Sequence, residues 1–165
     1  MTSYRYKTGL GQDSHRFLPE GSAKPCIIGG VIFSDAPGLS AHSDGDVVFH
    51  ALCNAITSIT TVPILGGIAN ELCLKDGITD SLVYLQKALD TLKETEVVHI
   101  ALSLEAKRPR LEKRLPEIRK NVAAAARISI QSVGATATSG DGLTDFGCGD
   151  GIQCFCILTV REKID

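Results

Sequence analysis

Apolar side chains recur along this chain with two different spacings. Over residues 44–60, 79–92 and 111–127 they return every three or four positions, as they do on one face of a helix. Shorter apolar or alternating runs, rich in β-branched residues, predict strands; these runs cover residues 4–12, 26–33, 97–104, 133–138 and 152–160. Strands and helices therefore alternate along the chain.

Capping and turn residues separate these predicted elements. Ser43 and Asp44 stand at the start of the first helix and Thr79-Asp80 at the start of the second, and all are residue types that cap helices. Residues 63–77 are rich in small side chains and predict a loop. Since no internal repeat or low-complexity linker interrupts the pattern, we expect a single α+β domain over residues 1–165, with a mixed β-sheet layered with helices.

Composition excludes several classes of function. A formal net charge of -2 leaves no basic excess for nucleic acid or acidic membranes, and the absence of tryptophan argues against base stacking. No apolar run approaches the ~20 residues that a membrane span needs. The six cysteines are scattered and no secretory leader opens the sequence, so we expect reduced thiols and a cytoplasmic protein.

Three of the four histidines lie beside carboxylates in two short segments. Asp13 and His15 are two residues apart, so on an extended segment both side chains point to the same side. His50 would add a second nitrogen, and Asp46, four residues earlier on the predicted helix, would orient its imidazole. Two nitrogens and one oxygen leave the fourth corner of a tetrahedral zinc open, as in catalytic sites.

The same residues also have an ordinary structural interpretation. Asp44 or Ser43 alone would explain the second segment as a helix cap, and the histidines would then be ordinary polar residues. The HExxH and CxxC spacings that identify many metal sites are missing. Spacing alone therefore leaves the metal site and the helix cap as alternatives.

Glycines mark two further places in the sequence. Gly29-Gly30, inside the predicted strand 26–33, indicates a bulge or a close approach of another backbone. The glycines of residues 139–151 would let backbone amides turn toward an anion, and Ser139 adds a hydroxyl donor. Asp141 is an oxygen ligand suited to a divalent ion that bridges phosphates. The Walker pattern of nucleotide-binding loops, GxxxxGK[ST], is missing. The alternative interpretation of this segment is a tight connection between two strands.

These segments together resemble the 2-C-methyl-D-erythritol 2,4-cyclodiphosphate synthases of the non-mevalonate isoprenoid pathway. The resemblance covers nearly the whole chain, in order: Asp13-Ser-His15, Ile27-Ile-Gly-Gly30, His42-Ser-Asp-Gly-Asp-Val-Val-Phe-His50, Arg108-Pro-Arg-Leu111 and Gly147-Cys-Gly-Asp-Gly-Ile152. It implies a homotrimer with active sites between subunits. Such an enzyme converts 4-diphosphocytidyl-2-C-methyl-D-erythritol 2-phosphate into the cyclic diphosphate and releases CMP.

The resemblance also implies two metal ions. Asp13, His15 and His50 would hold Zn²⁺ or a similar divalent transition metal, with a substrate phosphate oxygen at the open position. Asp141 would hold Mg²⁺ or Mn²⁺ between the α- and β-phosphates. Because the 2-phosphate of the substrate itself attacks the metal-bound β-phosphate, the protein needs no nucleophile. Positioning and charge neutralisation would then supply the rate.

The remaining implied roles concern the substrate. His42 and Ser139 would stabilise the transition state, and Ser43 would join His42 in holding substrate. Thr138 and Gly140 would donate hydrogen bonds toward the phosphates. The turn expected to receive the cytosine is Ala106-Lys107-Arg108-Pro109-Arg110. That turn is also basic enough to be an ordinary solvated surface.

Several positions depart from the family pattern. Gly67 stands where the family has an aspartate that contacts the methylerythritol, which leaves Glu71 or Asp76 as conceivable substitutes. Cys148 replaces an arginine, and a thiol cannot make the forked anion contact of a guanidinium. A ligand at the trimer axis is therefore not expected here. The other departures are Arg110 for lysine, Asp145 for an aromatic residue and Asp150 for glutamate.

Two functions of other classes compete with the synthase. One is a diverged relative that binds zinc and a cytidine nucleotide without turnover. The other is a zinc hydrolase, with water at the open metal position and Asp44 or Asp46 as the base.

Overall fold

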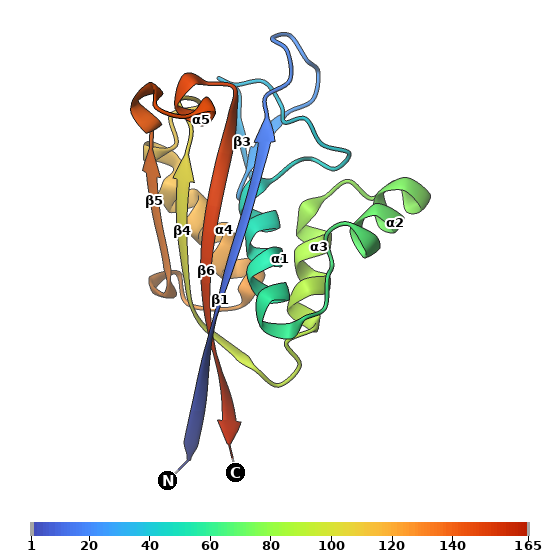
Figure 1. Cartoon of the computed structure of the whole chain (residues 1–165), viewed down its shortest axis with the longest axis vertical. Coiled ribbons are helices and arrows are strands. Elements are labelled where there is room, and N and C mark those ends of the chain that lie inside the picture. The colour runs from blue at the N-terminus through green and yellow to red at the C-terminus, as the bar shows by residue number, and fades with distance from the viewer. Residues whose placement is uncertain (1, 165) are drawn as a thin grey trace.

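A twisted four-stranded sheet forms the body of the computed structural model, which describes residues 2–164 (Figure 1). Its strands follow the order β1-β6-β4-β5 and comprise β1 (Ser3–Arg16), β6 (Gly151–Ile164), β4 (Glu96–Glu105) and β5 (Val133–Thr138). Only β4 and β5 run parallel; the other neighbours are antiparallel. The sheet is therefore mixed, and β1 and β5 are its two opposite edges.

Helices α1 (Val47–Thr60) and α4 (Leu115–Ala126) cover one face of this sheet, and α3 (Ser81–Asp90) packs against α1 (Figure 1). The helix α2 (Gly67–Asp76) projects away from the sheet beyond α3, and the four-residue α5 (Asp145–Cys148) lies at the upper end of the sheet (Figure 1). A small hairpin of β2 (Cys26–Ile28) and β3 (Val31–Phe33) lies beside α4. The three short 3-10 turns are Glu112–Arg114, Ile130–Ser132 and Gly140–Gly142. The expected α+β class, with a mixed sheet layered by helices, is confirmed.

Two glycines of β1 allow α1 to lie directly on the edge strand. A Cβ at Gly11 would stand 2.0 Å from the carbonyl oxygen of Ala51, and one at Gly9 would stand 2.2 Å from that of Ala55. Both contacts are with backbone, which cannot move aside as a flexible side chain could. Because of this close approach, the first turns of α1 reach the segment of β1 that carries Asp13 and His15.

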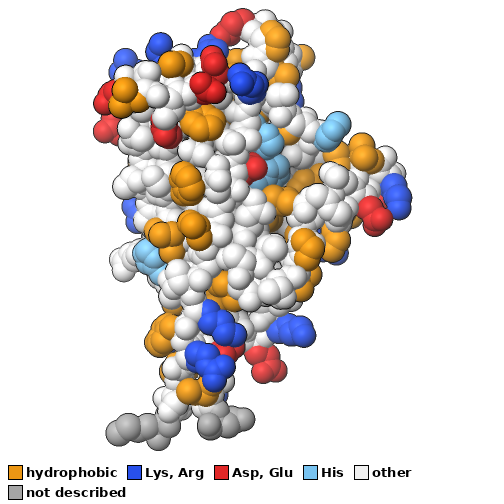
Figure 2. All heavy atoms as spheres, viewed as in Figure 1, with side chains coloured by type: hydrophobic (Ala, Val, Ile, Leu, Met, Phe, Trp, Pro, Cys, Tyr) orange, Lys and Arg blue, Asp and Glu red, His pale blue; other side chains and the backbone are white. Residues whose placement is uncertain are grey.

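The outer face of the sheet carries no helix and is partly apolar. Along β6, Cys154 and Cys156 are buried against the helices, whereas Phe155 and Ile157 point outward and are 42% and 45% exposed. Leu10 of β1, the register partner of Ile157, is 60% exposed. Figure 2 looks onto this face and shows the hydrophobic side chains scattered over the sheet.

Three sequence expectations about local structure need correction. Residues 63–77 are not only a loop, because they contain α2. Residues 26–33 form a hairpin, not one strand with a bulge. Gly29 and Gly30 are its turn, at φ 59° and 69°, a region that favours glycine. The predicted helix over 111–127 opens as a 3-10 turn, and α4 itself begins at Leu115.

None of the helices in the described part of the chain has the length and hydrophobicity needed to span a bilayer. All six cysteines are free thiols. Burial raises the pKa of Cys26 and of Cys156 to about 12.

Candidate metal centre and phosphate-binding segment

Three side chains from β1 and α1 converge at the edge of the sheet. The Oδ2 atom of Asp13 lies 3.0 Å from His15 Nε2 and 3.0 Å from His50 Nδ1, and the two nitrogens are 3.3 Å apart. Within residues 2–164, this is the group of three metal-ligand types that could hold one ion. Figure 2 shows histidine side chains beside an acidic one in a hollow next to the sheet.

The donor set and its spacing fit a tetrahedral metal. Zinc–ligand distances of about 2.0–2.2 Å place neighbouring ligand atoms about 3.3–3.6 Å apart. The three measured separations reach or fall slightly short of this range, so small side-chain rotations would admit the ion. Burial raises the pKa of Asp13, but its contacts with His15 and His50 lower it by more, so the carboxylate is ionised at neutral pH. The arrangement suits a divalent cation.

The predicted contact between the Asp46 carboxylate and the His50 imidazole is wrong. Asp46 is the residue that caps α1: its carboxylate accepts hydrogen bonds from the backbone amides of Val48 and Phe49. It also accepts from Gly29 and Gly30 at 2.8 and 2.6 Å, which ties the β2–β3 hairpin to the helix. Since the backbone of Asp46 is not helical, its side chain turns toward these amides instead of along the helix to His50.

His50 is oriented by another pair of residues, Asp44 and Ser81. His50 Nε2 lies 2.8 Å from the hydroxyl of Ser81, and that hydroxyl makes a short hydrogen bond to Asp44 Oδ1. Asp44 Oδ2 also accepts from the backbone amide of Ser81 at 3.0 Å. Asp44 and Asp46 are thus both occupied by structural hydrogen bonds, so neither fits the role of hydrolytic base.

A small pocket of about 250 Å³ opens over the three ligands. His42 is exposed at its rim, and Ser43 is buried, with its hydroxyl 3.4 Å from His50 Nε2. Lys24 fixes this segment: its ammonium group donates to the carbonyls of Leu39, Ala41 and Ser43 at 2.7, 2.8 and 2.5 Å. His42 and Ser43 therefore lie beside the metal ligands.

One wall of this pocket comes from α2, the helix that the sequence analysis missed. Ala69, Asn70 and Cys73 line the pocket, together with Leu65 and Gly66. Glu71 and Asp76, proposed as substitutes for the missing family aspartate, are not among the lining residues. Asn70 supplies the polar side chain on this wall.

The remaining predicted site residues lie at the other edge of the sheet. Thr138 ends β5 and Ser139 follows it, and both line a separate pocket of about 370 Å³ with most of the turn, namely Ala106, Lys107, Pro109 and Arg110. Arg108 instead pairs with Glu20 and lies over the ring of Phe17. Asp141 is exposed beside this pocket and accepts from the Ser139 hydroxyl at 3.1 Å. Within one chain these residues do not meet the metal ligands.

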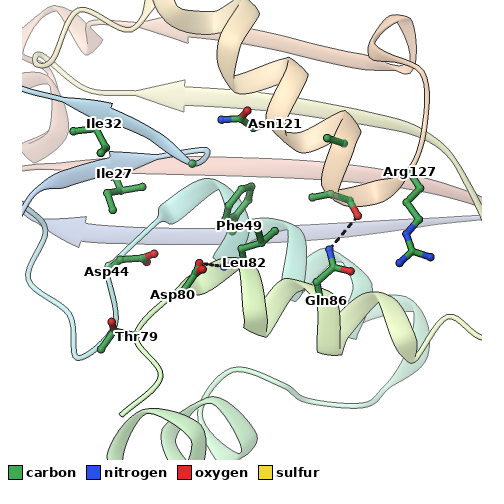
Figure 3. A pocket seen from close by; sticks show the side chains of 13 residues that line it. Ile27, Ile32, Asp44, Phe49, Thr79, Asp80, Leu82, Gln86, Asn121 and Arg127 are labelled. Atoms are coloured by element: carbon green, nitrogen blue, oxygen red, sulfur yellow. Dashed lines mark hydrogen bonds between the residues drawn. The ribbon is translucent and has the colours of Figure 1, made fainter. Parts of the chain in front are cut away.

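A cavity larger than either of these pockets lies apart from both groups of predicted residues. It measures about 780 Å³ and lies between the β2–β3 hairpin, α1, α3 and α4 (Figure 3). Phe49, Leu82 and Ile27 are among its apolar side chains, and Asp44 stands at one end with Arg127 at the other (Figure 3). Since it holds no cluster of metal ligands, we place the chemistry in the smaller pocket.

Sequence reasoning missed two residues that organise the site. Ser81 is 31 positions from its partner His50, and Lys24 is up to 19 positions from the carbonyls it binds. Neither pairing follows a helical or strand repeat, so spacing could not have found them. The glycine pair of β1 was an available signal, because glycine inside a strand indicates close packing.

Fold and site together define an α+β protein with a candidate three-ligand divalent metal centre. The comparisons with known proteins narrow that class. The family model described as YgbB family matches residues 6–161, so the chain belongs to this family. Its match is nearly as long as the chain.

Curated relatives are similar over almost their whole length. The protein named 2-C-methyl-D-erythritol 2,4-cyclodiphosphate synthase from Chlamydia felis is 57% identical over 158 residues, 95% of this chain and 90% of its own. The protein of the same name from Chlamydia muridarum is 53% identical over 95% of this chain and 89% of its own.

Solved structures share the fold. The bifunctional IspDF from Campylobacter jejuni matches with a TM-score of 0.86 and 26% identity; it covers 99% of this chain, which spans only 44% of that longer one. A structure of 2C-methyl-D-erythritol-2,4-cyclodiphosphate synthase matches with a TM-score of 0.78 and 25% identity over 93% of this chain and 99% of its own.

Proposed function

We propose that this chain is a metal-dependent, cyclising phosphorus–oxygen lyase. It converts 4-diphosphocytidyl-2-C-methyl-D-erythritol 2-phosphate to 2-C-methyl-D-erythritol 2,4-cyclodiphosphate with release of CMP, a step in isoprenoid precursor biosynthesis in the cytoplasm. Family membership and the names of the similar curated proteins support the substrate. The single structural observation that carries the proposal is the convergence of Asp13, His15 and His50 on one point.

The three converging residues would hold the catalytic metal. Asp13, His15 and His50 would bind Zn²⁺ or a similar divalent ion, and Asp141 would contribute a carboxylate to Mg²⁺ or Mn²⁺ beside the phosphates. When bound, the first ion supplies Lewis-acid polarisation of a phosphate oxygen. The chain itself provides the rigid frame, since β1 and α1 fix the ligands before substrate arrives.

Other side chains would bind and orient the substrate. His42 and Ser139 would donate to phosphate oxygens as negative charge develops on them, and Ser43 would hold the substrate beside His42. The hydroxyl of Thr138 and the amide of Gly140 would also face the phosphates. The turn from Ala106 to Arg110 would receive the cytosine.

Assembly is part of this proposal, because one chain separates the residues that must act together. Asp13 and His15 lie on the edge strand β1, whereas Thr138 and Ser139 lie at the end of β5, the opposite edge. A cyclic homotrimer would bring one edge of each copy against the other edge of its neighbour. The uncovered apolar face carrying Leu10, Phe155 and Ile157 supports burial against further copies.

Release of CMP from the cytidyl substrate tests the activity directly. The purified protein should release CMP and form the cyclic diphosphate, a chelator should abolish both products, and added Zn²⁺ with Mg²⁺ should restore them. Bound metal and nucleotide without CMP release would favour a binding protein. Hydrolysis of simple phosphate esters, without cyclisation, would favour a hydrolase.

Mixing two inactive variants tests the shared site. His50→Ala removes a residue of the metal half and Ser139→Ala one of the phosphate half, so no chain carries both halves intact. In randomly mixed cyclic trimers about one quarter of the sites would combine two intact halves. Co-expression should therefore restore about one quarter of wild-type activity. Activity no higher than that of Ser139→Ala alone would show that each site belongs to one chain.

A further inference from the structure

We propose that Asp44 and Ser81 are positioning residues that fix the ring orientation and the tautomer of the His50 imidazole and thereby strengthen divalent-metal binding by the Asp13–His15–His50 triad. This inference rests on the metal centre of the proposed function. It concerns the link from Asp44 Oδ1 through the Ser81 hydroxyl to His50 Nε2. Neither residue lines the pocket over the triad.

Counting hydrogen-bond donors determines where the protons lie. The Ser81 hydroxyl has one hydrogen and faces two partners, the Asp44 carboxylate and His50 Nε2. An ionised carboxylate can only accept, so the hydroxyl donates to Asp44. Nε2 must then carry a hydrogen and donate to Ser81. His50 Nδ1, the atom that faces Asp13 and His15, is left as the nitrogen that coordinates the metal.

The surroundings leave Ser81 as the main hydrogen-bond partner of His50 Nε2. Ser81 is fully buried and His50 is 7% exposed, so water is a poor substitute for either partner. The Ser43 hydroxyl is a weaker alternative, because it lies 3.4 Å from Nε2 whereas the Ser81 hydroxyl lies 2.8 Å away. The Asp44 carboxylate also accepts a hydrogen bond from the Ser81 backbone amide, so it binds Ser81 through two hydrogen bonds.

Such partners of metal ligands are energetically important. A hydrogen bond to the second imidazole nitrogen fixes the ring orientation and makes the coordinating nitrogen a better donor, and losing it costs about 10–100-fold in metal affinity. Rotation of the imidazole would also move Nδ1 away from the point where Asp13 and His15 meet. The effect therefore belongs to metal binding and not only to folding.

A purely structural role is the competing explanation, because Ser81 begins α3. The chain offers a matched control at the preceding residue. Asp80 caps α3 by accepting a hydrogen bond from the Leu82 amide, and its side chain makes no hydrogen bond to Ser81 Oγ or His50 within the described part of the chain. Asp80→Ala should weaken the start of α3 while leaving the link intact.

Zn²⁺ affinity, measured by competition with a chromophoric chelator on metal-free protein, tests the proposal. We expect Ser81→Ala and Asp44→Asn each to weaken Zn²⁺ binding about 10–100-fold, and Asp80→Ala to stay within about twofold of wild type. Thermal unfolding of the metal-free proteins identifies any variant that fails to fold. Should Ser81→Ala misfold, Asp44→Asn carries the test.

Two outcomes would overturn the inference. One is Zn²⁺ affinity in folded Ser81→Ala or Asp44→Asn within about twofold of wild type, and the other is an equal loss in Asp80→Ala. His50→Ala separates this failure from failure of the metal centre. If His50→Ala loses Zn²⁺ while Ser81→Ala keeps it, the triad stands and the positioning role falls. If His50→Ala also keeps Zn²⁺, the metal centre itself is wrong.

Discussion

Opposite edges of the same sheet carry two sets of polar residues that are held very differently. At β1, Asp13, His15 and His50 are half-buried or buried, and their atoms lie 3.0–3.3 Å apart. At the end of β5, Thr138 and Ser139 are exposed and belong to a glycine-rich segment. One set is organised by strand, helix and buried hydrogen bonds, whereas the other is organised mainly by local turns.

This difference indicates which step each set can perform alone. A cluster of ligands fixed by secondary structure can bind an ion before any partner arrives. Exposed hydroxyls and amides gain strength only when a ligand or a second chain excludes water from them. We therefore expect metal binding to be a property of one chain and turnover to be a property of the assembly.

Replacing His50 should have the largest effect. His50→Ala leaves Asp13 and His15 as two ligands, which is too few for a stable tetrahedral site. We expect loss of stoichiometric Zn²⁺ and a fall in CMP release of at least about 10³-fold, the order seen when an essential electrostatic group is lost. Metal analysis and the CMP assay measure the two effects. Normal metal content in His50→Ala would contradict the assignment of this ligand.

A charge on the outer sheet face should greatly reduce turnover while leaving metal binding intact. Phe155→Glu places a carboxylate on the apolar face, where burial against other copies would be costly. We expect a monomer by light scattering, activity reduced by about 10²–10³-fold through loss of the second half of the site, and unchanged Zn²⁺ stoichiometry.

An exposed apolar residue elsewhere provides the control for Phe155→Glu. Ile32 is 63% exposed on β3, away from the outer sheet face. Ile32→Glu should leave assembly and activity unchanged. A fully active monomeric Phe155→Glu would refute the dependence of turnover on assembly.

Removing the Ser139 hydroxyl should have a smaller effect. Ser139→Ala is expected to lower the turnover rate by about 10²-fold, the usual loss for one donor to a developing charge, while Zn²⁺ stays bound. Ser139→Thr keeps the hydroxyl and should remain active. An unchanged rate in Ser139→Ala would remove this residue from the catalytic set.

Much of the fold could be predicted because its elements carry strong periodic signals. The strands β4, β5 and β6 and the helices α1 and α3 lie where the apolar pattern placed them, and α4 lies inside its predicted range but begins later, at Leu115. α2 could not be found because its residues show almost no separation of apolar and polar faces, and it begins with glycine. Gly29 and Gly30 were correctly expected to permit close approach, but their positive φ angles make a hairpin turn.

The triad could be predicted from the sequence, whereas the residues that support it could not. Asp13 and His15 are two positions apart on one strand, so a simple alternation rule places them together. Asp46 was assigned wrongly to His50. Residues four positions apart share a helix face only when both are helical, and Asp46 precedes the first helical residue. Ser81 and Lys24 act through contacts with residues far away in the sequence, so local spacing cannot predict them.

The smallest effect we predict concerns Lys24, which belongs to the ordered half of the site without touching the metal ligands. Its ammonium group binds three carbonyls on both sides of His42. Burial lowers the pKa of Lys24, and the nearby Asp44 carboxylate raises it in part. Lys24→Met keeps the apolar stem and removes these hydrogen bonds, so the loop should lose its fixed conformation.

Substrate kinetics and metal analysis on the same Lys24 variants test whether rigidity extends beyond the triad. We expect kcat to fall about tenfold in Lys24→Met, since small displacements of a positioned group are costly to rate, with little change in Zn²⁺ content. Lys24→Arg retains a donor that can reach the same carbonyls and should recover part of the rate. If Zn²⁺ content falls together with kcat, the loop and the triad form one cooperative unit. If neither quantity changes, the rigid half of the site ends at the metal ligands, and His42 is positioned by substrate instead.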